Sequence, residues 1–552
     1  MSEESRAPGR RPERRAVRTA LTDEGYLPTE YAVDRLLLRG NPEEAGPVLE
    51  ELAEIVRPLG LGVELEQGDL DDFALIRQAD LPDDVAAGVI AAAGYGVRLV
   101  PLPGLGVGDP ATQNDAWDAL TVLRAARPKL SVTLDHVVRG TVGGQEWPDI
   151  RPFPYTQPHP YTQPHPYTQP HPYTQPHPYT QPHPSEVLPE YATPGLGGRS
   201  PVAWIGPRPV RRAKVAARPV VAVLDTGTGE HPWLTDAVVR DPEVLGVPIG
   251  SYVPPSPEAD PEVGGMSLAP LTGGLDPAAG HGTFIAGLIH QECPDATILS
   301  CRLFGGDAVI SEWDLLRCLR RLLLAHVLGM LGRTGYVPVD ILSLSLGYYH
   351  ERPEDADFDL PFAACLAALA GHGVSLVVSA GNHGVTRPLY PAAFGPELAG
   401  EPPAPVPPAA FYADRLPILS VAALNPDGST ALFSNDGPWV TCRRPGAALV
   451  STMPVTLRGS HTPSRDLAGR LPGERRRTIA PESYAGGFGV WSGTSFSAPV
   501  LAGELAAALA RARGEEAEAK EVTSDRWDRQ VAARCKRSWG AVTEVTGVSP
   551  TR

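Results

Sequence analysis

From about residue 217 onward, short apolar and β-branched runs alternate with segments of helical periodicity. The strand-like runs are almost continuously apolar, which is typical of parallel strands covered on both faces. Strands that alternate with helices in this way predict an α/β fold, a doubly wound parallel sheet. The expected strands are 220–224, 296–303, 340–346, 374–379 and 418–423, and the expected helices are 282–290, 311–329, 361–370 and 495–510.

The N-terminal part has a different pattern, which predicts a small α+β domain over residues 26–145. A strand, a helix and a strand are followed by a second group of the same kind, so the pattern is roughly βαβ twice over. The first helix is expected to begin at Asn41, a residue type that caps helix N-termini. The expected elements are strand 31–38, helix 41–56, strand 61–65, strand 97–102, helix 112–126 and strand 130–138.

The hexapeptide PYTQPH repeats five times without error between these two parts, from Pro154 to His183. Its proline spacing favours polyproline II, in which six residues make two turns and place all five histidines on one face. Successive histidines would then lie about 19 Å apart, too far to chelate one ion within the strand. A semi-rigid spacer is therefore favoured over a metal-binding strip, and docking of a partner on the repeat stays open.

These patterns divide the chain into five segments. The expected organisation is a disordered Arg-rich leader (1–25), the small α+β domain (26–145), a Pro-rich linker with the repeats (146–216), the α/β domain (217–511) and a charged C-terminal tail (512–552).

Composition and charge exclude several classes of protein. The 552 residues include 64 acidic and 48 basic ones, a formal net charge of −16, which argues against a nucleic-acid-binding protein. The six cysteines form no CxxC pair, so a zinc knuckle is not expected. No apolar run approaches the roughly 20 residues of a membrane span, and the first 20 residues lack the apolar core of a signal peptide. We therefore predict a cytoplasmic protein.

Polar side chains occur where the predicted strands end and where two predicted helices begin. Asp225 and Asn382 each follow an apolar strand, and His281 and Ser495 each stand at the start of a helix. Because ligands bind at the carboxyl ends of parallel strands, we expect these four side chains to meet at one edge of the sheet. An acid, a base, a hydroxyl and an amide donor at one site are what acyl transfer needs.

The chemistry assigns a role to each of these residues. A serine hydroxyl needs a base to take its proton, and His281 is predicted to be that base for Ser495. Asp225 is predicted to orient the imidazole and to stabilise its protonated form. Asn382 and the backbone N–H of Ser495 are predicted to bind the oxyanion.

The motifs DTG at Asp225, GHGT at His281, SAGN at Asn382 and GTSFSAP at Ser495 follow one another in this order. Together they resemble the subtilisin-like serine peptidases (peptidase S8 family) over residues 217–511. The resemblance implies a serine endopeptidase that hydrolyses peptide bonds through an Asp-His-Ser triad and an acyl-enzyme intermediate.

The resemblance also implies that Ser345, Leu346 and Gly347 pair with the backbone of an extended polypeptide substrate. No metal ligand and no cofactor are predicted for the chemistry. The family's calcium sites are not recognisable, so a structural calcium stays open.

The family's usual residues after the nucleophile are replaced by Phe496 and Ser497, and a Tyr348-Tyr349 pair follows the substrate strand. These departures leave the specificity open.

Two alternatives remain open at this level. A catalytically silent protein that binds peptides or acts as a scaffold would have the same fold, although all four site positions are intact. Residues 26–145 resemble the propeptide domain of secreted subtilisin-like enzymes, and an unrelated regulatory domain is the alternative. We hypothesise that residues 26–145 restrain the peptidase by limiting access to its cleft. The physiological substrate, the trigger, the oligomeric state and any cleavage of the tether are not indicated.

Overall fold

The computed structural model describes most of the two globular parts. The described residues are 14–16, 29–102, 114–141, 189–193, 197–215, 217–268, 274–351, 360–401, 403–458, 466–468, 471, 473–477, 483–515 and 527–551. The PYTQPH repeats and most of the predicted leader lie outside them.

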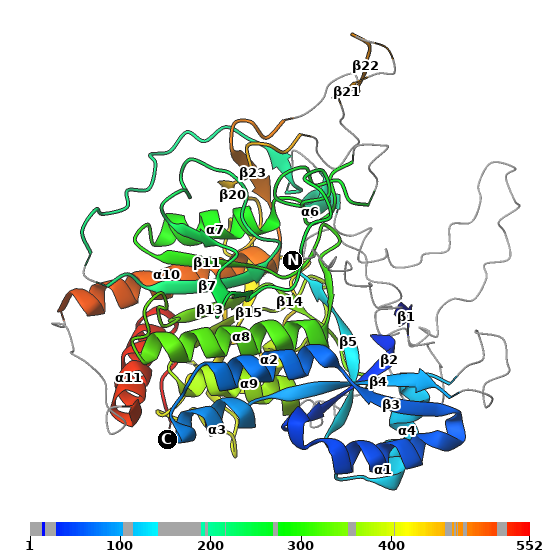
Figure 1. Ribbon diagram of the computed structural model, residues 1–552. Coiled ribbons are helices and arrows are strands. Elements are labelled where there is room, and N and C mark those ends of the chain that lie inside the picture. The colour runs from blue at the N-terminus through cyan, green and yellow to red at the C-terminus, as the bar shows by residue number, and fades with distance from the viewer. Residues whose placement is uncertain are drawn as a thin grey trace, which may run out of the picture.

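A seven-stranded parallel sheet forms the centre of the larger part (Figure 1). The strand order is β19-β18-β15-β13-β7-β11-β8, and every neighbouring pair is parallel. The predicted α/β fold with a parallel sheet is thereby confirmed. The strands are β7 (Val220–Asp225), β8 (Val238–Arg240), β11 (Thr297–Arg302), β13 (Ile341–Leu344), β15 (Ser375–Ser379), β18 (Ile418–Leu424) and β19 (Cys442–Pro445).

Helices cover both faces of this sheet, as its continuously apolar strands require. In Figure 1, α7 (His281–Glu292) and α10 (Thr494–Glu515) lie on one face of the sheet, and α8 (Glu312–Met330) and α9 (Leu360–Gly371) lie on the other. All strand residues of β7, β13 and β15 are buried. Among the described residues, no helix is both long enough and apolar enough to cross a membrane.

Shorter elements surround this centre. They are α6 (Pro189–Ala192), β6 (Ser200–Pro201), β9 (Glu243–Val244), β10 (Val247–Pro248), β12 (Val309–Ser311), β14 (Leu346–Gly347), β16 (Leu398–Ala399), β17 (Ala404–Pro405), β20 (Leu449–Thr452), β21 (Asp466–Ala468), β22 (Arg475–Arg477) and β23 (Phe488–Trp491).

The smaller part is built on an antiparallel sheet with helices, which confirms the predicted α+β class. Its main strands lie in the order β5-β2-β4-β3, and α1 and α4 pack against this sheet. In chain order the elements are β1 (Arg14–Ala16), β2 (Glu30–Arg39), α1 (Gly46–Val56), β3 (Leu61–Leu65), α2 (Gln67–Gln78), α3 (Asp83–Ala91), β4 (Gly94–Pro101), α4 (Ala116–Ala126) and β5 (Val132–Gly140).

The last strand of the smaller part extends into the larger one. The first half of β5 pairs with β2 of its own sheet. Its second half lies between β12 and β14 of the larger part and is antiparallel to both. Arg139 pairs with Val309 on one edge and with Gly347 on the other. One sheet of seven strands therefore crosses from the small domain into the large one.

The two parts also share a hydrophobic core. Phe73, Ile76 and Val89, from α2 and α3, belong to the same buried cluster as the core of the parallel sheet. Beside them, Asp72 of α2 forms ion pairs with arginines of α8, with N···O distances of 2.7–3.0 Å. The small domain is therefore packed against the large one over a buried surface. The three arginines are Arg317, Arg320 and Arg321.

The structure differs from the predictions in four segments. The helices α2 and α3 lie between residues 66 and 96, a stretch for which the sequence pattern predicts no element. Three residues of the expected disordered leader, Arg14–Ala16, pair with β2. The last part of the expected linker packs on the large domain. There the guanidinium of the buried Arg199 donates to the main-chain carbonyls of Asp276, Pro277 and Ala279.

The fourth difference concerns the expected charged tail, 512–552. Here a 20-residue helix, α11 (Trp527–Thr546), packs against α10. Trp527 and Trp539 are buried on its inner side, and Arg534 donates to Asp340 at 3.0 Å. The charges dominate the composition of this segment, but its aromatic residues recur on one helix face and reach the core.

Candidate active site

Asp225 and His281 are brought together at the carboxyl edge of the parallel sheet. Asp225 is the last residue of β7, and His281 is the first residue of α7. Their side chains are buried, and His281 Nδ1 lies 2.8 Å from Asp225 Oδ1. Gly280 before the helix has φ of +80°, a left-handed conformation that glycine adopts readily. The carboxylate therefore holds the imidazole by one nitrogen and leaves Nε2 for another partner.

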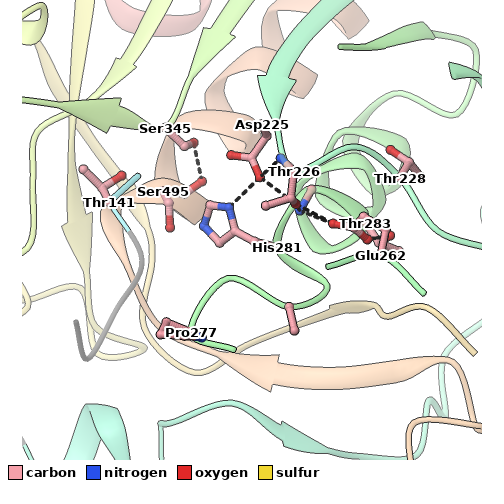
Figure 2. A network of polar contacts seen from close by, with 12 residues as sticks. Thr141, Asp225, Thr226, Thr228, Glu262, Pro277, His281, Thr283, Ser345 and Ser495 are labelled. Atoms are coloured by element: carbon pink, nitrogen blue, oxygen red, sulfur yellow. Dashed lines mark hydrogen bonds and ion pairs between the residues drawn. The ribbon is translucent and has the colours of Figure 1, made fainter. Parts of the chain in front are cut away.

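Ser495 lies on the other side of the imidazole (Figure 2). It is the second residue of α10, so its N–H belongs to the helix turn whose donors have no intrahelical acceptor. Ser495 Oγ and His281 Nε2 are both buried, and neither has a hydrogen-bond partner among the described residues. Catalytic hydrogen bonds are often long in the absence of bound substrate. The predicted acid, base and nucleophile are thus neighbours.

Asn382 is held with its amide group directed toward the same point. Its Oδ1 accepts hydrogen bonds from the N–H and from the hydroxyl of Thr494, each at 2.8 Å. These bonds leave Nδ2 as the free end of the amide, and Nδ2 donates to the carbonyl oxygen of Thr141 at 2.6 Å. The predicted oxyanion donor therefore contacts a main-chain carbonyl of the chain itself.

The predicted substrate strand is also occupied by the chain itself. Leu346 and Gly347 form β14, which pairs with the end of β5. The next N–H along the chain, that of Thr141, donates to the Ser345 carbonyl at 2.9 Å. Ser345 in turn donates its hydroxyl to the Ser495 carbonyl at 2.9 Å. All three predicted substrate-binding residues therefore line the end of the small domain's last strand.

The Thr141 side chain is buried beside Ser495 (Figure 2). It is 2% exposed, and its Oγ1 lies 2.7 Å from Ser379 Oγ at the end of β15. A Cβ placed on Gly493 would lie 2.9 Å from Ser495 Oγ, 3.4 Å from Asn382 Nδ2 and 3.5 Å from the Thr141 carbonyl oxygen. These three polar atoms therefore surround a single point next to Gly493.

With this geometry established, known proteins provide a comparison. The model of the Subtilase family matches residues 217–537, which is more than half of the chain. The chain belongs to the subtilase family. Its relatives by family are serine peptidases, whose substrates are polypeptides. No curated protein sequence matches the chain.

Solved structures of three proteases resemble this subtilase at low sequence identity. A lanthipeptide protease is 18% identical, with 57% of this chain and 78% of that chain covered and a TM-score of 0.34. A cold-adapted subtilisin-like serine proteinase is 17% identical, with coverages of 63% and 94% and a TM-score of 0.34. Fervidolysin from Fervidobacterium pennivorans, a keratinolytic enzyme related to subtilisin, is 17% identical, with coverages of 88% and 55% and a TM-score of 0.41.

Glu262 is a residue of this subtilase that sequence reasoning missed. Its buried carboxylate accepts hydrogen bonds from Thr226 Oγ1 at 2.5 Å, Thr283 Oγ1 at 2.5 Å and the Gly282 N–H at 3.0 Å (Figure 2). Thr226 and Gly282 directly follow Asp225 and His281, so Glu262 joins the two segments that hold the acid and the base. No signal marks it, because it lies in an irregular loop far from every motif.

Burial raises the pKa of Glu262 to about 7. The hydrogen bonds from Thr226 and Thr283 and the charge of Arg302 lower it, while the negative charge of Asp225 raises it. Desolvation of the carboxylate outweighs the three lowering contributions. The group therefore changes its charge near neutral pH.

The aromatic departures from the family's sequence lie in the core. Phe496 is fully buried, with its ring 5.2 Å from the His281 ring and 4.5 Å from that of Phe284. Tyr348 and Tyr349 are buried as well, and the Tyr349 hydroxyl contacts His383 Nδ1 at 2.9 Å. Phe496 therefore supports the back of the imidazole.

Proposed function

We propose that this subtilase is a serine endopeptidase in which Ser495 is the nucleophile. His281 takes the Ser495 proton, Asp225 orients the imidazole, and Asn382 with the Ser495 N–H binds the oxyanion. The 2.8 Å contact between Asp225 and His281 and the shared position of Ser495 beside Nε2 support these roles. The chemistry we propose uses these side chains and water and requires no metal or cofactor.

We further propose that the small domain restrains the enzyme by occupying its cleft. One observation carries this proposal: Asn382 Nδ2 donates to the Thr141 carbonyl, the position that a scissile carbonyl needs. The antiparallel pairing of β5 with β14 is the pairing that an extended substrate makes. Ser495 and His281 are each 0% exposed, so no second peptide reaches them while β5 is in place.

The same geometry supports cleavage of the bond between Thr141 and Val142. Ser495 Oγ would attack the Thr141 carbonyl carbon and form an ester, while the C–N bond to Val142 breaks. His281 would carry the serine proton to the departing amine. Water would then hydrolyse the ester, releasing a chain that ends in the Thr141 carboxylate. Such cleavage would cut the tether that joins the two domains.

The mass of the purified full chain tests this proposal. Wild type is expected to resolve into fragments 1–141 and 142–552 under denaturing conditions, and Ser495→Ala is expected to stay intact. Ser497→Ala is the matched control, because Ser497 is equally buried on the same helix and its Oγ is not part of the site. A fluorophosphonate probe that reacts with serine nucleophiles gives the second measurement, with labelling expected at Ser495 alone.

Failure of both measurements would favour the alternative function. A wild-type chain that stays intact and is not labelled, even after the small domain has been loosened by mutation, is a silent peptidase-fold protein that binds its own strand.

The cytoplasmic location predicted from the N-terminal sequence is kept as part of the proposal, and cell fractionation would test it.

A further inference from the structure

Four buried polar residues gather beside the cleft, outside the proposed catalytic residues. They are His136 on β5, Glu312 at the start of α8, and His350 and Glu351 after β14. His136, His350 and Glu351 each offer one potential ligand atom, and these three atoms lie within 4.8 Å of one another. All four residues are at most 3% exposed.

The pairing of β5 brings these residues together. Val137 pairs with Ser311 of β12, so the antiparallel register places His136 beside Glu312. Arg139 pairs with Gly347 of β14, and the same register, continued by three residues, places His136 beside His350. Residues from three distant parts of the sequence therefore meet only when β5 lies in the cleft.

The two contacts that Glu351 makes with the histidines of this cluster are longer than direct hydrogen bonds. His136 Nε2 lies 3.4 Å from Glu351 Oε1, and His350 Nδ1 lies 3.7 Å from Glu351 Oε2. Hydrogen bonds between nitrogen and oxygen are shorter, about 2.7–3.2 Å. Two ligands on one tetrahedral metal ion, each about 2.1 Å from it, are about 3.4 Å apart. Among the described residues, His136 Nε2 and Glu351 Oε1 have no hydrogen-bond partner.

The other nitrogen of His136 is held as in a metal site. Its Nδ1 lies 2.8 Å from Glu312 Oε2. A carboxylate that accepts from one imidazole nitrogen fixes the tautomer and directs the lone pair of the other nitrogen toward the metal. The Tyr348 ring stacks on His136 with a centroid distance of 4.7 Å, which fixes the plane of the imidazole.

We propose that His136, His350 and Glu351 bind a zinc-class divalent cation, with Glu312 orienting His136. Two imidazoles and one carboxylate suit zinc, whereas calcium and magnesium prefer ligands that are all oxygen. The site joins the small domain to the large one, so the ion holds β5 in the cleft. Metal binding does not depend on the proposed peptidase activity, whereas its effect on access to Ser495 does.

Zinc binding to the full chain tests the proposal. The Ser495→Ala chain is used so that self-cleavage is excluded, and metal is removed with a chelator before titration with Zn²⁺. Competition with a colorimetric chelator gives affinity and stoichiometry, and titration with Co²⁺ gives the visible bands of a four-coordinate site. One tight ion per chain is expected, and Ca²⁺ is expected to leave the cobalt bands unchanged.

Substitutions locate the ion. His136→Asn and Glu351→Gln are expected to abolish the tight site, and Glu312→Gln to lower Zn²⁺ affinity about 10–100-fold. His290→Asn is the matched control, since it changes another buried histidine outside the cluster. The five histidines of the PYTQPH repeats remain in every variant, so weak binding there cancels in the comparison.

Two results would overturn the metal site: a wild-type cluster that binds no Zn²⁺, or a tight site that survives in His136→Asn. Glu312→Gln keeps an oxygen beside His136 and is expected to fold. If His136→Asn does not fold, the Zn²⁺ affinity of Glu312→Gln therefore decides whether the metal site exists. Fluorophosphonate labelling of the wild-type chain separates the two proposals. Zinc bound without any serine labelling, before or after chelation, would support the metal site and contradict the peptidase.

Discussion

The side-chain amide of Asn382 donates a 2.6 Å hydrogen bond to the main-chain carbonyl of Thr141, a residue 241 positions earlier in the chain. The chain thus places its own carbonyl oxygen where the proposed mechanism forms the oxyanion, opposite the Asn382 donor. Because Asn382 is itself fixed by Thr494, the amide is oriented before any substrate arrives.

Replacing this amide is expected to slow catalysis and leave the fold intact. Asn382→Ala should lower kcat for a peptide substrate by about 10²–10³-fold, the loss that follows removal of this donor in subtilisin, with KM nearly unchanged. Asn382→Asp keeps an oxygen for Thr494 but loses the donor, so a similar loss is expected. Turnover that stays at the wild-type level in both variants would remove Asn382 from the mechanism.

Weakening the ion pairs between the domains is expected to open the cleft. Burial would raise the pKa of Asp72, but three arginines of α8 outweigh it and hold the pKa below its usual value. Removing one partner of a buried ion pair costs about 3–5 kcal/mol. Since about 1.4 kcal/mol of lost docking free energy changes the open population tenfold, Asp72→Asn should be labelled by fluorophosphonate more than about tenfold faster.

Asp71→Asn is the control for this prediction. Asp71 is the neighbouring residue on α2, but it is exposed and its hydrogen bond goes to Gln67 on the same helix. Equal labelling rates for Asp72→Asn and Asp71→Asn would mean that α2 does not hold the cleft closed.

Glu262 is expected to make stability depend on pH. Its pKa is about 7 in the folded chain against 4.5 ordinarily, so the folded state binds a proton that the unfolded state has lost. The contribution of this group to the free energy of unfolding is therefore fully present below pH 4.5 and is lost as the pH rises to 7. The loss is about 3 kcal/mol, since each pKa unit corresponds to about 1.4 kcal/mol.

Glu262→Gln mimics the protonated carboxyl and should abolish this loss. Thermal unfolding of both chains between pH 5 and pH 8 checks this. The melting temperature of the variant is expected to increase relative to that of wild type as the pH rises. Glu258→Gln, an exposed position in the same loop, is expected to follow the wild-type curve. A difference in melting temperature between Glu262→Gln and wild type that does not change with pH would contradict the raised pKa of Glu262.

The burial of Thr141 and its contact with Ser379 predict a preference for small, hydroxyl-bearing residues before the bond that we propose is cleaved. Ser379 Oγ lies 2.7 Å from Thr141 Oγ1, and a hydrogen bond of this kind contributes about 0.5–1.5 kcal/mol. Ser379→Ala should therefore reduce the preference for Thr over Val about two- to tenfold in a peptide series. Ser343→Ala, in the neighbouring strand β13, should leave the preference unchanged; equal ratios in both variants would show that Ser379 does not select the residue.

Sequence pattern predicts the parallel sheet and the meeting of the site residues for a physical reason. Buried parallel strands are continuously apolar, and glycines surround each polar residue at the sheet edge, so Asp225, His281 and Ser495 are visible as local signals. The helix α2 gives no such local signal, because its buried acidic residues are balanced by arginines about 250 positions later in the sequence. Glu262 is hidden in the same way, since its partners are defined only by the folded loop.

The insertion of β5 is beyond local sequence analysis as well. Its two edges pair with segments about 170 and 210 residues further along the chain, and no motif announces either pairing. A resemblance to a propeptide suggests restraint in general, but the register that places Thr141 at Asn382 is defined only in the folded chain.

The position of β5 between β12 and β14 has a consequence for any event that separates the two domains. Its departure would leave unpaired amide and carbonyl groups along β12 and β14 in the emptied cleft, and along both edges of the departing end of β5. Such open edges recruit other strands, including those of identical molecules. A liberated N-terminal fragment is therefore expected to self-associate as its concentration rises, and the freed peptidase to capture any extended chain.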